Sequence, residues 1–206
     1  MLVLGVQNLG AMSFDFEALD RNSRIALQLV TNFAGGTLNG KFSTVVGNIE
    51  FPVEAPQKSS GRVELDARSI RFGFGKVTGD AHSIEWLNSA KFPRVSFVLE
   101  GMKDTRWEGK SLYATAFGPL SLKNKTIVLS IPLKIQYQRA GRRKYDGIKG
   151  DLLLIEGESW ISRGDFGINP RSSYDSVLDR VLVKVQLVGA SKRIRSLLPS
   201  ALFKKE

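Results

Sequence analysis

Apolar and polar residues alternate along most of this chain, with a period of two residues. The clearest run extends from Ile127 to Tyr137, where six alternate positions in eleven residues are apolar. The same pattern recurs at 25–29, 63–65, 95–99 and 181–187. Successive side chains of a strand point to opposite faces of a sheet, so this period is typical of strands with one buried face. The pattern predicts an all-β protein.

Turn-forming residues divide the pattern into nine predicted strands. These are residues 14–20, 23–32, 37–51, 60–70, 92–103, 107–117, 127–137, 151–163 and 176–190. Gly40 and Gly47 lie where the apolar positions of 37–51 change parity, and glycine inside a strand often marks a bulge or a barrel corner. Eight or nine antiparallel strands favour a closed up-and-down barrel over a sandwich, because closure leaves no unpaired edge.

One short helix is expected to interrupt the strands. Residues 78–90 carry Ile84 and Leu87 three positions apart, and Thr78 or Asp80 is available as an N-cap. No internal repeat or linker divides the chain. We therefore expect one all-β domain, a closed antiparallel barrel with a short helical insert.

The composition narrows the function classes. The chain has 206 residues, enough for one domain with a sizeable core. It has no Cys, which excludes thiolate metal sites and Cys nucleophiles, and its one His argues against a His-based zinc site. No apolar run reaches the roughly 18 residues of a membrane-spanning helix. We expect no catalytic residue, metal or cofactor, and no enzymatic activity.

The charge of the chain points to an anionic partner. Thirty Lys and Arg residues stand against 20 Asp and Glu, which gives a formal net charge of +10. Basic residues gather in segment 139–149 and in a tail, 191–206, whose apolar residues recur at near-helical spacing. Both segments are candidates for peripheral contact with an anionic membrane, and docking of the tail would bring the barrel mouth near the bilayer. Packing of the tail on the barrel is the alternative, and nucleic acid is the less favoured partner.

The first residues of the chain bear on its location. Residues 1–13 are mostly apolar or small and carry no charged side chain. They are similar to the end of a secretory signal, although the basic start of such a signal is missing. This interpretation predicts a periplasmic or secreted protein. A plain N-terminal strand, compatible with a cytoplasmic location, is the alternative.

Short blocks in the order and spacing of a known family run through residues 14–190. They are LNGKF at 38–42, GNIEF at 47–51, SGRVELDARSI at 60–70, FPRVSF at 92–97, GPLSL at 118–122 and ISRGDFGI at 161–168. On these blocks the chain resembles the YceI family, the lipocalin-like polyisoprenoid-binding proteins. It departs from the family at Asp80, where members often carry a His, and in the basic segment 139–149.

The resemblance implies an eight-stranded lipocalin-like barrel that holds a long apolar chain inside. A barrel of this size is wide enough for one small ligand or for the side chains that fill it. The residues expected on the lining or at the mouth are Phe42, Ile49, Trp86, Leu87, Val95, Phe97, Leu99, Ile131, Leu133, Trp160, Arg163 and Phe166. Periodicity alone favours a filled core at these positions, and the resemblance favours a cavity.

Four of the singled-out residues have two interpretations each. Trp86 and Leu87 either form a lid over the barrel mouth or cap that end of the barrel. Arg163 and Asp165 either anchor a polar ligand group or fix a turn, and the turn is favoured because Arg at a strand end usually binds backbone carbonyls.

The adjacent pair His82 and Ser83 forms no catalytic dyad on a helix, because neighbouring helical positions do not face each other.

These observations favour non-enzymatic binding, storage or transport of a long-chain amphiphilic lipid, such as a polyisoprenoid or an isoprenoid quinone precursor. The alternative is a basic interaction protein with a filled barrel that binds nucleic acid or an anionic surface. The sequence leaves open the ligand's length and head group, which strand face lines the cavity, and the oligomeric state, a homodimer included.

Overall fold

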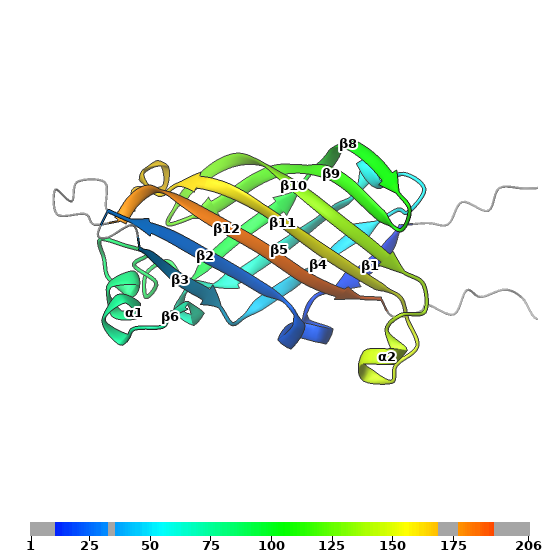
Figure 1. The fold of residues 1–206 in the computed structure, drawn as a ribbon, viewed down its shortest axis with the longest axis horizontal. Coiled ribbons are helices and arrows are strands. Elements are labelled where there is room, and N and C mark those ends of the chain that lie inside the picture. Colours follow the sequence, from blue (N-terminus) through cyan, green and yellow to red (C-terminus); the bar gives the residue numbers. More distant parts are fainter. Residues whose placement is uncertain (1–10, 33–35, 169–176, 192–206) are drawn as a thin grey trace, which may run out of the picture.

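The computed structural model describes residues 11–32, 36–168 and 177–191, which form an elongated barrel (Figure 1). The predicted N-terminal extension and C-terminal tail lie mostly outside these ranges, although Met12 and Ser13 already belong to the first strand. No helix in the described ranges is long and apolar enough to cross a membrane.

Eight strands form the barrel wall, and each of the first four is interrupted once. In chain order they are β1 (Met12–Asp15) with β2 (Arg24–Thr31), β3 (Thr37–Phe42) with β4 (Val45–Phe51), β5 (Ser60–Asp66) with β6 (Arg71–Phe72), β7 (Arg94–Leu99) with β8 (Gly101–Glu108), β9 (Ser111–Leu122), β10 (Lys125–Gln138), β11 (Leu152–Ser162) and β12 (Val177–Ala190). Each strand pairs with its neighbours in the sequence, and β12 also pairs with β2 and, through Asp15 and Ala190, with β1. The predicted closed antiparallel barrel is confirmed.

Short helices connect the strands at both ends of the barrel. They are η1 (Glu17–Asn22), η2 (Pro56–Lys58), η3 (Ala67–Ser69), α1 (Gly75–His82), α2 (Arg143–Asp146) and η4 (Gly164–Phe166). α1 and α2 lie at opposite ends of the barrel, at the left and right of Figure 1. These ends are called the α1 end and the α2 end below.

The structure corrects several predicted strand boundaries. The predicted strand 14–20 is mostly the 3-10 helix η1, which interrupts the first strand of the wall. The predicted strand 37–51 bends at Ser43 and Thr44, whose backbone N–H groups both donate to the Ser69 hydroxyl at 3.3 Å. This bend explains the change of parity, because β3 pairs with β2 and β4 pairs with β5.

Two further predicted strands, 92–103 and 107–117, are displaced along the chain. The turn lies at 109–110, between β8 and β9, so β7 and β8 together form one wall strand and β9 forms the next. Alternation identified the strands here but could not place the turn. The register with β9 shifts between Lys103 and Arg106, which disturbs the pattern at this point.

The longer helix, α1, lies earlier in the chain than the predicted helix 78–90. It ends at His82 because Ser83 adopts an extended backbone, with φ −64° and ψ 168°. Ile84 is 77% exposed whereas Leu87 is buried, so their three-residue spacing does not form one helical face. Leu87 is held by a turn in which its N–H donates to the Ala81 carbonyl at 3.1 Å.

Side chains fill the barrel towards the α2 end. The fully buried residues there include Phe14, Phe51, Leu112, Ile135 and Leu153. The Phe14 ring makes edge-to-face contacts with the rings of Phe51 and Tyr137, at centroid distances of 6.4 and 6.3 Å. Such contacts add to the stabilisation from apolar burial. This packing forms a solid floor inside the barrel.

Two glycines allow neighbouring strands to approach closely where the wall bends. Gly47 of β4 has φ +127°, and a Cβ there would lie 2.0 Å from the Arg62 carbonyl oxygen on β5. Gly118 of β9 has φ +155°, and its Cβ would lie 1.9 Å from the Val98 carbonyl oxygen. Residues with a side chain rarely adopt this backbone conformation. The predicted barrel corner at Gly47 is therefore confirmed.

We expect Gly47→Ala to lower the free energy of unfolding by about 1–3 kcal/mol or more, because the methyl group adds a backbone clash to an unfavourable φ. Chemical denaturation monitored by circular dichroism measures the change. The matched control is Gly79→Ala, since Gly79 lies in α1 with open space around it. This control should stabilise the protein by up to about 1 kcal/mol. An unchanged unfolding midpoint for Gly47→Ala would contradict the proposed corner.

Candidate functional site

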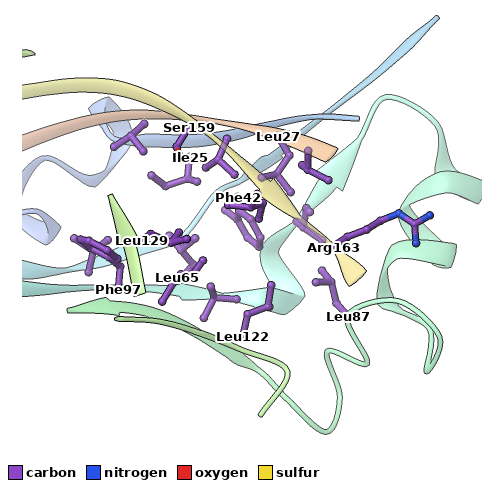
Figure 2. Close-up of a pocket in the computed structure, with 18 of the residues that line it drawn as sticks. Ile25, Leu27, Phe42, Leu65, Leu87, Phe97, Leu122, Leu129, Ser159 and Arg163 are labelled. Carbon is purple, nitrogen blue, oxygen red and sulfur yellow. The ribbon is translucent and has the colours of Figure 1, made fainter. Parts of the chain in front are cut away.

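A cavity of about 630 Å³ occupies the part of the barrel nearer the α1 end (Figure 2). All eight wall strands contribute residues to its lining, at alternate positions such as Leu129, Ile131 and Leu133 of β10. Its volume lies within the roughly 300–1,000 Å³ that is typical of sites for small ligands. The barrel is therefore hollow at one end and filled at the other.

The exposure of residues on β10 shows where the hollow part ends. Leu129, Ile131 and Leu133 point inward and are nevertheless partly exposed, since they face the cavity. Ile135, the next inward residue towards the α2 end, is fully buried. The cavity wall is mostly aliphatic or aromatic, so it suits a hydrocarbon, whose burial contributes about 0.8 kcal/mol per CH₂ group.

The cavity reaches the protein surface at the α1 end. Lys76, Asp80, Ser83 and Glu85 border it there, and all four are exposed. Lys76 Nζ lies 3.4 Å from a carboxylate oxygen of Asp80, one turn later in α1. Because this pair is exposed, it contributes little to stability and is accessible to the polar group of a ligand.

Most of the site residues expected from the sequence lie on the cavity wall. They are Phe42, Ile49, Trp86, Leu87, Val95, Phe97, Leu99, Ile131, Leu133 and Arg163. These residues come from β3, β4, β7, β10, the loop after α1 and the end of β11. The structure thus brings together residues that are up to about half of the chain apart in sequence.

Two of the expected site residues do not line the cavity. Trp160 lies on the outer face of β11, where it is 45% exposed and the guanidinium carbon of Arg180 lies 5.0 Å from the centroid of its ring. Its neighbours Ser159 and Ile161 point inward instead, since alternation leaves only one face of the strand inside. Phe166, the last residue of η4, is buried in the core and is not part of the cavity wall.

Sequence reasoning missed the contributions of β2 and β12. Ile25, Leu27 and Leu29 of β2 line the cavity, together with alternate residues of β12 from Val181 to Leu187. The same alternation that identified these strands could have identified these positions. Val77 and Ala81 of α1 also line the cavity. No pattern in the sequence marked them, because the predicted helix was misplaced.

Arg163 fastens the loop after β11 at the α1 end. Its guanidinium donates hydrogen bonds to the backbone carbonyls of Ile168 (2.9 Å), Val177 (3.1 Å) and Leu178 (3.3 Å). Its guanidinium carbon lies 5.4 Å from the centroid of the Trp86 ring. Burial lowers the pKa of Arg163 from its ordinary value. The contacts match the turn-fixing role that the sequence favours, whereas Asp165 is exposed and not part of the cavity wall.

Lys123, in the turn between β9 and β10, fastens two loops at the α1 end. Its ammonium group donates to the carbonyls of Ile84 (3.0 Å), Glu85 (3.3 Å) and Gly167 (3.2 Å). Burial lowers the pKa of Lys123. Sequence analysis identified a turn here but had no signal for this contact. An ammonium group has three N–H donors, so these three carbonyls can use all of them.

The single His is held by structural contacts. His82 Nε2 lies 3.3 Å from the Arg71 guanidinium, and Nδ1 lies 2.9 Å from the Ser89 hydroxyl. Because a guanidinium can only donate, Nε2 is the acceptor and Nδ1–H donates to Ser89 in the neutral ring. The interaction of His82 is therefore with Ser89 and Arg71, and the adjacent Ser83 takes no part in it.

The basic segment 139–149 lies at the α2 end, opposite the opening of the cavity (Figure 1). Ser191, the last described residue, lies at the same end, where its hydroxyl accepts from the Asp151 N–H at 2.9 Å. Residues 192–206, most of the predicted tail, are outside the described residues. Contact of segment 139–149 with a membrane would thus point the cavity opening away from that membrane.

Solved structures with the same fold support the description of the barrel. Burkholderia cenocepacia BcnA is 18% identical with a TM-score of 0.65, covering 81% of this chain and 95% of its own. A Campylobacter jejuni YCEI protein is 14% identical with a TM-score of 0.61, covering 74% and 84%. A polyisoprenoid binding domain from Saccharophagus degradans is 12% identical with a TM-score of 0.62, covering 88% and 99%.

The family assignment comes from the sequence match. No functionally curated protein matches the chain significantly. Residues 17–189 match the family profile described as the YceI-like domain. This range extends from the start of η1 to Gly189, near the end of β12. The protein therefore belongs to the YceI-like domain family.

Proposed function

We propose that this protein binds a long-chain amphiphilic lipid of the polyisoprenoid class, with the chain inside the barrel, and that it does so without catalysis. The observation that carries the proposal is the apolar cavity, which has a solid floor and an opening at the α1 end. The structural similarity to a polyisoprenoid binding domain supports the same ligand class.

The volume of the cavity indicates how much of a chain it can hold. If each heavy atom of the ligand takes the roughly 30 Å³ that a water molecule occupies in the liquid, about 630 Å³ holds about 21 atoms. This corresponds to about four five-carbon isoprene units. Any further units of a longer chain would remain at the opening.

The length of the cavity wall also indicates how many isoprene units the cavity can hold. On β12 the wall extends from Val177 to Leu187, or roughly 33 Å at roughly 3.3 Å per residue. A strand tilt of about 40° leaves a depth of roughly 25 Å along the barrel axis. An extended peptide backbone advances roughly 3.5 Å for each residue, which contributes three bonded atoms. An isoprene unit contributes four atoms to the length of its chain, so by the same measure it spans roughly 4.7 Å. The depth thus accommodates about five units.

We place the ligand's polar end at the opening, beside Lys76, Asp80 and Ser83. Beyond the opening, the wall is mostly apolar, with Asn48, Arg62 and Ser159 as its polar residues apart from Arg163, and an unpaired polar group buried in the apolar part would be unfavourable. The opening carries Asp80 and Glu85 against Lys76, so its chemistry suits a small neutral polar head group such as a hydroxyl.

The alternative of a basic interaction protein supposed a filled barrel. The cavity argues against that interpretation, since the inward residues of β10 face open space. We also propose storage or transport in the periplasm or outside the cell as the setting of the activity. Fractionation of the source cells tests this setting.

Native mass spectrometry with prenyl alcohols of increasing length tests the proposed ligand. We expect one alcohol per protein, with affinity that rises up to about four or five isoprene units and then levels off, because further carbons stay outside the cavity. A protein that remains unbound with every alcohol of the series would refute the proposed function.

A tryptophan in the hollow part should shorten the cavity. We expect Leu133→Trp to weaken binding of an alcohol of about four isoprene units at least about tenfold and to leave an alcohol of two units nearly unaffected. The unfolding free energy should change by less than the about 1–3 kcal/mol that overpacking of a filled core costs. Ser130→Trp, on the outer face of the same strand, is the control for both measurements. Lost stability with unchanged binding would show that the ligand lies elsewhere.

A further inference from the structure

The α1 end exposes large apolar side chains around the cavity opening. Among the described residues, the three most exposed large hydrophobic side chains are Ile84 (77%), Val128 (68%) and Phe74 (67%). Phe74 and Ile84 flank α1, and Val128 lies on the part of β10 nearer the same end. A single exposed apolar residue is ordinary. Three of them at the end where an apolar cavity opens form a pattern.

The segment that carries Phe74 and Ile84 is apolar on two sides. Its inner side contributes Val77, Ala81 and Leu87 to the cavity wall. Its outer side presents Phe74 and Ile84 to solvent. The same short stretch of chain thus separates the cavity from the surroundings and offers an apolar surface to both.

Hydrogen bonds hold this exposed arrangement in place. The Thr78 hydroxyl bonds with both backbone groups of Phe72, at 3.0 and 3.2 Å, and the Thr78 N–H donates to the Phe74 carbonyl at 3.0 Å. The Ile84 carbonyl accepts from Lys123 at 3.0 Å. The backbone on either side of α1 is therefore fixed, and both apolar side chains are held outward.

Cationic side chains surround the same surface. The Lys76 side chain, two residues after Phe74, is 89% exposed and pairs with Asp80, and that of Arg68 is 64% exposed and pairs with Asp66. Arg71 and Lys91 are exposed as well. Apolar residues that enter the acyl region, with basic residues at the level of the phosphates, are the features by which a surface binds a bilayer.

We propose that the α1 end docks onto a phospholipid bilayer by inserting Phe74 and Ile84. This inference rests on the proposed function, because the bilayer is where a polyisoprenoid chain resides. Docking in this orientation places the cavity opening, with its polar border, at the membrane interface beside the acyl region, so that the ligand chain enters or leaves without crossing bulk water. The basic segment 139–149 then points away from the membrane.

Vesicle flotation with phosphatidylcholine containing phosphatidylglycerol tests the proposal. We expect Phe74→Ser/Ile84→Ser to lower the partition coefficient at least about tenfold for each side chain removed. The loss should persist at about 1 M salt, where the Debye length is only about 3 Å and charge attraction is screened. The matched control is Tyr145→Ser/Ile148→Ser at the α2 end, whose side chains are 50% and 51% exposed. This control should bind vesicles like the unmodified protein.

Site-specific labelling gives a second measurement that is independent of the stability of the double variant. The chain has no Cys, so Ile84→Cys and Ile148→Cys each provide one site for an environment-sensitive dye. We expect vesicles to shift the emission of the dye at position 84 to the blue and to leave the dye at 148 unchanged. A shift at 148 alone, equal flotation of the Phe74→Ser/Ile84→Ser variant, or a loss confined to the α2-end variant would overturn the proposal.

The closing control separates this inference from the proposed function. Without vesicles, the Phe74→Ser/Ile84→Ser variant should bind a prenyl alcohol of about four isoprene units as the unmodified protein does, because neither residue lines the cavity. If both proteins bind the alcohol and both float equally, only the docking proposal fails. If neither binds the alcohol while flotation still depends on Phe74 and Ile84, only the proposed ligand fails.

Discussion

Closure of the sheet is the constraint on which the other features of this molecule depend. β12 pairs with β11 along one edge and with β2 along the other, so every wall strand has two hydrogen-bonded neighbours. A closed barrel has an inside and an outside, and the period of two assigns every second residue to each. Bends at Ser43 and Gly47 let the wall close, at the cost of local conformations that only certain residues tolerate.

The same wall serves two purposes along its length. Towards the α2 end, the rings of Phe14, Phe51 and Tyr137 fill the interior and supply the packed core. Towards the α1 end, inward residues such as Val183 and Val185 line a hollow interior. The filled part of the barrel therefore supplies stability, and the hollow part supplies the room for a ligand. A chain of limited length can enter without disturbing the packing that keeps the protein folded.

The positive charge of the chain likewise has more than one role. Arg163 and Lys123 donate to backbone carbonyls and fasten the loops around the cavity opening. Arg163 is buried and Lys123 is partly buried, and each supplies hydrogen bonds to carbonyl groups of these loops. Lys76 and the basic residues of segment 139–149 other than the buried Arg142 instead present their charge to solvent at opposite ends of the barrel. Net charge alone therefore says little about which surface meets an anionic partner.

Local pattern determined the strands, the closed barrel and the family, because alternation and short motifs depend on neighbouring residues. Alternation placed Ile131 with Leu133 and Val95 with Phe97 on one face of each strand, and the structure shows that this face is the inner one, whereas Trp160 was misassigned although its own strand alternates. Only the tertiary structure decided that the barrel is hollow at one end, since this depends on how side chains from eight strands fill a shared space. The tertiary structure alone also showed that Lys123 donates to the carbonyls of Ile84 and Gly167. It likewise showed that Phe74 and Ile84 are exposed around the cavity opening. These contacts join segments that are distant in the chain, and no local pattern encodes such distances.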